Sequence, residues 1–139
     1  MKIKVLDYGY EKLPLRAHAN DAGADVYAHI TGEGTIVIPP NHTRKIPLGL
    51  GLILPDGYAA YVFPRSGLST KGIVCELPPI DSGYRGEIHA IVTNVGTESF
   101  VVHNGDRIGQ LVITPVVIAD FITEDITERG SNGFGSTGV

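Results

Sequence analysis

Short apolar runs with alternating polar positions recur along the chain, separated by glycine, proline, asparagine and aspartate. A period of two residues is typical of half-buried β-strands, and the 3.6-residue period of an amphipathic helix is almost absent. The runs predict strands over residues 2–8, 24–30, 35–40, 44–55, 58–64, 87–95, 99–104 and 107–122. Many short strands at roughly even spacing indicate an all-β sandwich or jelly-roll barrel.

One segment, residues 64–72, breaks this pattern and reads PRSGLSTKG. Proline followed by small polar residues predicts one or two helical turns, which would gather unpaired backbone N–H groups beside Arg65 and Ser66. Such a cluster is able to bind an anion. A simple surface loop has the same composition, and the segment alone favours that simpler interpretation.

Composition narrows the class of protein. With 139 residues, 42% of them apolar, the chain is expected to be one globular domain. The net charge of −4 argues against broad nucleic-acid binding, and the first 14 residues have no apolar run that predicts a signal peptide or membrane span. The lone cysteine, Cys75, excludes an internal disulfide and fits the cytoplasm.

The last eleven residues, RGSNGFGSTGV, are rich in glycine and have few large side chains. Gly133 and Gly135 allow positive φ and close approach to a ligand, Arg129 offers a fork for a phosphate, and Phe134 a ring for stacking. These properties suit a lid that orders over a nucleotide. A frayed terminus has the same composition, and composition alone favours it.

Three polar residues inside the predicted strands and turns are further candidates. Asp81 lies in the turn IDSGYRGEI and is either a general base or an ordinary turn aspartate. Asp25 stands at the mouth of a predicted strand, where it could bind a metal ion or water. Gln110 interrupts an apolar strand and needs a partner in the protein or in a substrate.

Five short motifs occur in order: AGADVYA, PRSGLS, IDSGYRGEI, GDRIGQLV and RGSNGFGSTG. Together they resemble the trimeric dUTP pyrophosphatases (dUTPases), and the resemblance runs from about Pro14 to the last residue. It implies a jelly-roll-like β-barrel domain over residues 1–128, with one short helix, and a mobile Gly-rich lid over residues 129–139. It also implies a cytoplasmic homotrimer with shared active sites, in which one subunit supplies the first, second and fourth motifs, a neighbour the third, and the remaining subunit the lid.

The resemblance also implies an activity, the hydrolysis of dUTP to dUMP and pyrophosphate, which limits uracil in DNA. Asp81 would activate the water that attacks the α-phosphorus, and Mg²⁺ would bridge the phosphates, with Asp25 acting through a water. Tyr84 would stack beneath the deoxyribose. By match to the motifs, the substrate-binding residues are Arg65, Ser66, Gly67, Ile80, Tyr84, Gln110, Arg129, Phe134, Gly135, Ser136 and Thr137.

The segment before Asp81 differs from the family pattern, because it reads GIVCELPPID where an Asn and a Gly are usual. Pro78 and Pro79 have no N–H to donate, so any uracil contact made by an amide at those positions is lost or moved. Cys75 or Glu76 occupies the region of the usual Asn.

Two rival functions share this fold. The dCTP deaminases need a glutamate in the strand after the third motif, where this chain has Ile91 in HAIVTN. A regulatory, protein-binding member would not need the complete set of Asp81, Arg65, Gln110 and Arg129. A purely structural jelly roll would leave those motifs without a purpose.

Overall fold

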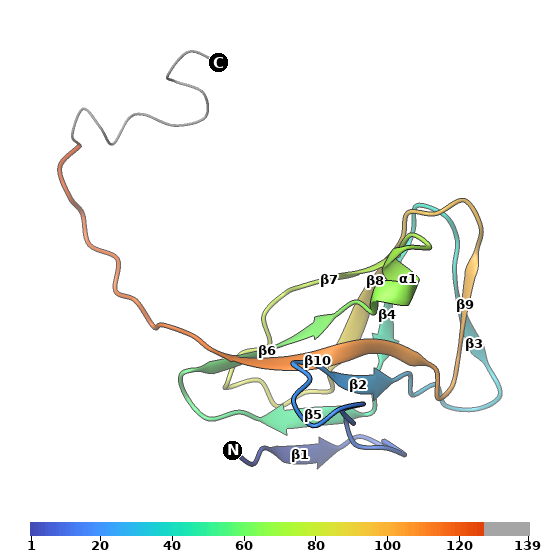
Figure 1. Cartoon of the computed structure of the whole chain (residues 1–139), viewed down its shortest axis with the longest axis horizontal. Helices are drawn as coiled ribbons and strands as arrows, with labels where there is room; N and C mark the ends of the chain where they lie inside the picture. The colour runs from blue at the N-terminus through green and yellow to red at the C-terminus, as the bar shows by residue number, and fades with distance from the viewer. Residues whose placement is uncertain (127–139) are drawn as a thin grey trace.

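The computed structural model describes residues 1–126, which form ten β-strands and one short helix (Figure 1). The expected all-β class with a single short helix is confirmed. The strands are β1 (Lys4–Asp7), β2 (Ala24–Tyr27), β3 (Thr35–Ile38), β4 (Thr43–Pro47), β5 (Leu50–Ile53), β6 (Tyr58–Phe63), β7 (Ile73–Glu76), β8 (His89–Asn94), β9 (Phe100–His103) and β10 (Arg107–Pro115), and the helix is α1 (Ser66–Ser69).

The strands pair antiparallel in four small sheets of orders β1-β5, β2-β10-β6, β3-β9 and β4-β8-β7. Their inward positions meet in one apolar core, as the period of two requires. The largest fully buried apolar side chains come from seven strands and one loop position: Val26, Ile38, Ile46, Leu50, Ile88, Val92, Val102 and Ile108. Burying each stabilises the fold by about 1.5–3 kcal/mol.

Three strand boundaries differ from the prediction. Residues 44–55 form two strands, β4 and β5, because Gly49 adopts φ +73° and redirects the chain into a different sheet. Residues 73–76 form β7, a strand that the prediction omitted. The predicted strand 107–122 ends at Pro115, and the apolar residues after it are not in a strand.

The helix α1 follows β6 directly. Arg65 caps it in extended conformation, with φ −87° and ψ 135°, and accepts hydrogen bonds from the amides of Leu68 and Ser69. The second motif therefore contains a single helical turn, where the segment alone had favoured a surface loop. No helix within residues 1–126 is long and apolar enough to cross a membrane.

Beyond β10 the chain leaves the barrel as an extended segment, the C-terminal arm (residues 116–126), drawn in orange and red in Figure 1. Its first amide, from Val116, still donates to Gly57 at 2.8 Å. The arm then carries five large apolar side chains that are 78–95% exposed: Val117, Ile118, Phe121, Ile122 and Ile126. Five such side chains in an eleven-residue segment are apolar surface that a partner would bury.

One polar side chain, Asn94, lies fully inside the barrel at the end of β8. Its amide nitrogen donates to the carbonyls of Ile38 at 2.9 Å and Glu98 at 2.7 Å, and its oxygen accepts from the Gly96 amide at 2.9 Å. Asn94 therefore ties β3, β8 and the following turn together through three hydrogen bonds, one buried and two partly buried.

We expect Asn94→Ala to lower the free energy of unfolding by about 3 kcal/mol, because it leaves buried backbone groups without partners. Urea unfolding followed by circular dichroism at one fixed protein concentration measures this loss. Asn20→Ala, at an exposed loop position, is the control and should change stability by less than about 0.5 kcal/mol. Equal stability of the two variants would contradict the structural role of Asn94.

Candidate active site

The sheet β2-β10-β6 brings three of the sequence motifs together. In its register Gln110 of β10 lies opposite Asp25 of β2 on one side and Phe63 of β6 on the other. Because Pro64 and Arg65 directly follow Phe63, the loop of the second motif begins beside Gln110. The Gln110 side-chain amide donates to the Pro64 carbonyl at 3.0 Å, which answers the need for a partner noted in the sequence.

Two arginines and one carboxylate gather beside this glutamine. The Arg65 guanidinium donates to the Arg107 carbonyl at 3.2 Å, and the Arg107 guanidinium donates to the Asp25 carboxylate at 3.3 Å. A register shift between Arg107 and Gly109 marks a β-bulge at this place, and bulges re-aim side chains next to functional sites. The cluster of Asp25, Arg65, Arg107 and Gln110 is called the phosphate-side cluster below.

Arg107 was not among the residues predicted for the site. It is part of the fourth motif, GDRIGQLV, but its pairing with Asp25 depends on the register between β2 and β10. The signal in the sequence that could have identified Arg107 was a charged residue at the start of a mostly apolar strand.

Glycine at position 23 permits the close packing of this cluster. A Cβ atom there would overlap the Gln110 side chain, coming within 2.8 Å of its Cδ. A larger residue would therefore displace Gln110. The first and fourth motifs are thus joined by close packing as well as by strand pairing.

The second motif presents an open backbone surface. Ser66 and Gly67 occupy the first turn of α1, whose leading amides have no partner within a helix. A Cβ atom built on Gly67 would meet nothing within 4 Å among residues 1–126. A ligand thus has room to approach the backbone here, next to Arg65.

The third motif lies on the far side of β6 from β10. Ile80 exchanges two backbone hydrogen bonds with Ala60, at 3.1 and 2.8 Å, and Asp81 follows it with an exposed side chain. Within residues 1–126, no hydrogen bond or ion pair joins Asp81 to Arg65 or Gln110. One chain therefore brings the first, second and fourth motifs together and keeps the third apart.

The third motif lines part of an open cavity of about 160 Å³ beside the segment between β7 and β8. We call it the hairpin cavity. The two sides of the hairpin and parts of β4 and β6 line it: Lys45, Val62, Glu76, Pro78, Ile80, Tyr84, Glu87, Ile88, His89 and Ile91. Tyr84 is 46% exposed, and its hydroxyl donates to the Glu87 carbonyl at 2.9 Å, which holds the ring at the cavity.

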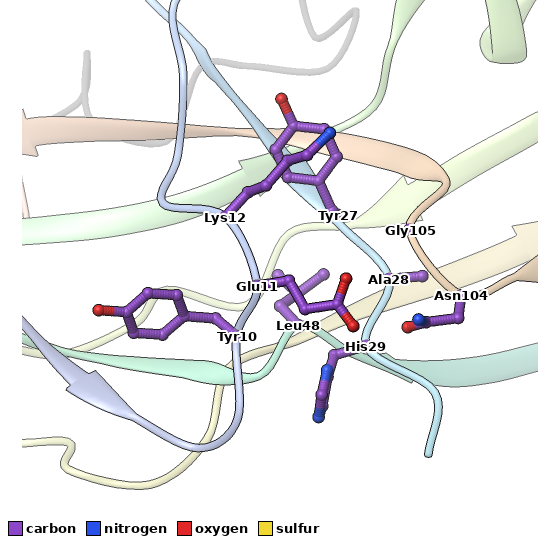
Figure 2. A pocket seen from close by; sticks show the side chains of 9 residues that line it. All are labelled: Tyr10, Glu11, Lys12, Tyr27, Ala28, His29, Leu48, Asn104 and Gly105. Atoms are coloured by element: carbon purple, nitrogen blue, oxygen red, sulfur yellow. The ribbon is translucent and has the colours of Figure 1, made fainter. Parts of the chain in front are cut away.

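Figure 2 shows another cavity, of about 100 Å³, between residues 10–12, the end of β2 and the Asn104–Gly105 turn. There the Lys12 side chain crosses the Tyr27 ring, with Nζ 5.1 Å from the ring centroid. The lining contains none of the predicted site residues. We interpret it as a packing feature that holds residues 10–12 against β2.

Magnesium, expected from the resemblance, needs few protein ligands when it binds a nucleoside triphosphate, because phosphates and waters fill most of its coordination shell. Within residues 1–126, no three His, Cys, Asp or Glu side chains form a metal-binding group. The Asp25 side chain is 22% exposed and is partly neutralised by Arg107. A single carboxylate of this kind fits an ion held mainly by phosphate oxygens.

Cys75 faces the core from β7 and is not a nucleophile. Burial raises the pKa of its thiol to about 11, and the negative charge of Glu76 adds to the shift. The reactive form is the thiolate, so this side chain acts as a small apolar residue. Of the predicted site residues, Arg129, Phe134, Gly135, Ser136 and Thr137 lie outside residues 1–126.

Comparison with known proteins places the chain in context. The dUTPase family profile matches residues 10–138. The deoxyuridine 5'-triphosphate nucleotidohydrolase of Maricaulis maris is 47% identical over 149 residues, covering 100% of this chain and 96% of that protein. Its counterpart in Desulfitobacterium hafniense is also 47% identical, over 135 residues, covering 92% of this chain and 88% of that protein.

Solved structures agree with this result. The dUTPase of Staphylococcus bacteriophage 80alpha, solved with dUPNHPP, superimposes with a TM-score of 0.83 at 27% identity, covering 99% of both chains. The dUTPase of phage phi11 of S. aureus superimposes with a TM-score of 0.82 at 23% identity, covering 92% of this chain and 99% of that chain. A mutant of the phi11 protein coordinates a structural Mg(II) ion.

We expect Cys75 of the native protein to react with Ellman's reagent at pH 8 at least about 100-fold more slowly than in urea, because a pKa two units higher leaves about 100-fold less thiolate. The absorbance of the released thiol anion gives both rates. Equal rates in the two conditions would contradict a buried, protonated thiol.

Proposed function

The chain belongs to the dUTPase family and hydrolyses dUTP to dUMP and pyrophosphate, and on this premise we propose how its residues divide the reaction. The observation that carries the proposal is the phosphate-side cluster. Strand register and a bulge hold Asp25, Arg65, Arg107 and Gln110 together beside the open turn of α1. A triphosphate needs this combination of cationic forks and free amides.

Arg65, the Ser66 hydroxyl and the Gly67 amide bind the phosphate chain, and Gln110 donates to it in place of the Pro64 carbonyl. Arg107 is a positioning residue, because it holds the Asp25 carboxylate at 3.3 Å. When bound, Mg²⁺ neutralises phosphate charge, and Asp25 would hold it through a water. Most of the rate enhancement then comes from positioning and electrostatic stabilisation.

Asp81 is the general base that deprotonates the water attacking the α-phosphorus. Its exposed carboxylate follows directly on Ile80, whose two backbone bonds to Ala60 fix the start of the turn. The hairpin cavity accepts the uracil, and Tyr84 at its edge stacks beneath the deoxyribose and excludes a 2′-hydroxyl. The hydrogen bond from the Tyr84 hydroxyl to Glu87 keeps the ring in that position.

The separation of Asp81 from the phosphate-side cluster supports a homotrimer in which each active site is shared between subunits. One subunit supplies that cluster, and a neighbour supplies Asp81 and the hairpin cavity. The C-terminal arm supports self-association, because its apolar side chains are exposed in the single chain. Its eleven residues span about 36 Å when extended, enough to reach a neighbouring barrel.

The barrel also offers apolar surface to such an arm. A groove of about 590 Å³ opens between the N-terminal strand and the sheet β2-β10-β6. Its lining is mostly apolar: Met1, Ile3, Val5, Leu13, Pro14, Arg16, Ala24, Leu52, Tyr58, Leu111 and Ile113. An exposed apolar arm and an open apolar groove on the same chain are complementary surfaces.

The fifth motif completes the site as a lid over residues 129–139, after a barrel domain of residues 1–128. In this proposal Arg129 and the Ser136–Thr137 turn bind the γ-phosphate, Phe134 covers the uracil, and Gly135 lets the backbone approach. A lid of this kind excludes bulk water from the phosphates and leaves room for the one water that attacks the α-phosphorus. The single unpaired cysteine suits the reducing cytoplasm, where we place this activity.

We expect Asp81→Asn to bind dUTP with little change and to lower kcat by at least ~10², because the amide cannot accept the proton of the attacking water. Pyrophosphate release with Mg²⁺ gives kcat, and equilibrium binding of a non-hydrolysable dUTP analogue gives affinity. Glu33→Gln removes the same charge at an exposed turn and should keep full activity. Near wild-type turnover of the Asp81 variant would disprove the assignment of the base.

We expect the double variant Phe121→Ser, Ile122→Ser to associate more weakly than the wild type, because it removes apolar surface from the arm. Light scattering after size exclusion measures the mass, which for a trimer is three times 14.8 kDa. Val95→Ser, at an exposed turn of the barrel, is the control. A double variant with the full trimer mass at every concentration would exclude the arm as the main contact.

A further inference from the structure

The turn that carries the third motif has little regular structure of its own. Residues 81–88 lie outside every strand, and the side chains of Asp81 and Tyr84 are exposed. Backbone hydrogen bonds fix the two ends of the turn, where Ile80 is bonded to β6 and Ile88 to β5. The middle of the turn needs other contacts if the functional side chains are to keep one position.

A tyrosine from the N-terminal segment supplies such a contact. Within residues 1–126, two hydrogen bonds join residues 81–86 to other segments of the chain. The Tyr8 hydroxyl donates to the Arg85 carbonyl at 2.6 Å, across 77 positions of sequence. The Ser82 hydroxyl lies 3.4 Å from the Asp56 carboxylate, beyond the usual range of about 2.5–3.0 Å for such a bond. The bond from Tyr8 is therefore the main anchor of the turn.

Tyr8 is itself held in place by the backbone. The amides of Tyr8 and Tyr10 both donate to the Gly49 carbonyl at 3.0 Å. The Gly49 amide in turn donates to the Glu87 carboxylate at 2.8 Å. Gly49 thus joins the segment that carries Tyr8 to the end of the third-motif turn. The position of the Tyr8 hydroxyl relative to that turn is set by these three bonds.

The peptide group that Tyr8 holds supports the Tyr84 ring. A Cβ atom built on Gly86 would lie 2.7 Å from Cζ of Tyr84, so the ring lies directly against Gly86. A Cβ atom on Gly51 would lie 2.8 Å from the Gly86 carbonyl oxygen and 3.1 Å from the Tyr8 ring. Glycine has a wide range of backbone angles, so the Arg85–Gly86 peptide group is free to rotate unless its oxygen is held.

We propose that Tyr8 is a positioning residue that holds the Tyr84 ring in place through the Arg85–Gly86 peptide group. Tyr8 thereby sharpens the discrimination between deoxyribose and ribose. This inference rests on the proposed role of Tyr84 in excluding a 2′-hydroxyl. Steric exclusion needs a fixed ring, because a ring that retreats slightly admits the larger sugar. Tyr8 lies before the five motifs, so this contribution comes from outside them.

Pyrophosphate release with Mg²⁺ gives kcat/KM for dUTP and for UTP. We expect Tyr8→Phe, which keeps the ring and removes the hydroxyl, to lower the ratio of dUTP to UTP by about 5-fold, as for loss of one neutral hydrogen bond. Tyr84→Ala should lower the same ratio by at least ~10-fold. The double variant should have the ratio of Tyr84→Ala alone, because Tyr8 acts through that ring.

Tyr10→Phe is the matched control. It removes the same hydroxyl two positions along the chain, and within residues 1–126 that hydroxyl has no hydrogen-bond partner. It should keep the wild-type ratio. Thermal melting verifies that all the variants fold. A merely structural role of Tyr8 would change hydrolysis of both nucleotides alike and leave the ratio unchanged.

Four results would overturn the inference. A wild-type ratio in Tyr8→Phe, with a lowered ratio in Tyr84→Ala, defeats the role of Tyr8 and leaves the proposed function standing. A further fall in the double variant defeats the path through Tyr84. An unchanged ratio in Tyr84→Ala removes the sugar-excluding role on which the inference rests. A wild-type protein without dUTP hydrolysis removes the proposed function and this inference together.

Discussion

Strand β10 pairs with neighbours along both of its edges, and most of the site depends on that constraint. One edge fixes Asp25 beside Gln110, and the other fixes the start of the loop that carries Arg65. Since strand register changes in steps of one residue, a slip would turn Gln110 from the site toward the core. The bulge after Arg107 and the missing side chain at Gly23 then allow close packing without strain.

Much of the fold could be predicted from the sequence because alternation reports burial directly. The strands at residues 24–27, 58–63 and 89–94 lie inside the predicted runs. Alternation fails to predict strands where apolar residues stay exposed in the single chain. Residues 116–122 read as the continuation of a strand, yet Pro115 ends the ladder and the following side chains are exposed. The prediction also omitted β7, because its four residues, followed closely by two prolines, are too short a run to indicate a strand.

The candidate site was partly predictable. For the second motif, the segment alone left a helical turn open but favoured a surface loop, and the structure has the helical turn at Ser66–Ser69. The contact between Arg107 and Asp25 could not be predicted, because strand pairing brings together two residues that are 82 positions apart in the sequence. The distance of Asp81 from the phosphate-side cluster came only from the resemblance to a family, since no local pattern encodes an arrangement between chains. Pro78 and Pro79, noted as a departure from the family pattern, are where β7 and β8 separate around the hairpin cavity.

The C-terminal arm has a consequence for the life of the newly made chain. An extended backbone with exposed apolar side chains is a good substrate for proteases and a target for chaperones. In the single chain, the arm is therefore the described segment at which proteolytic cleavage would begin, well before the paired strands of the barrel become accessible.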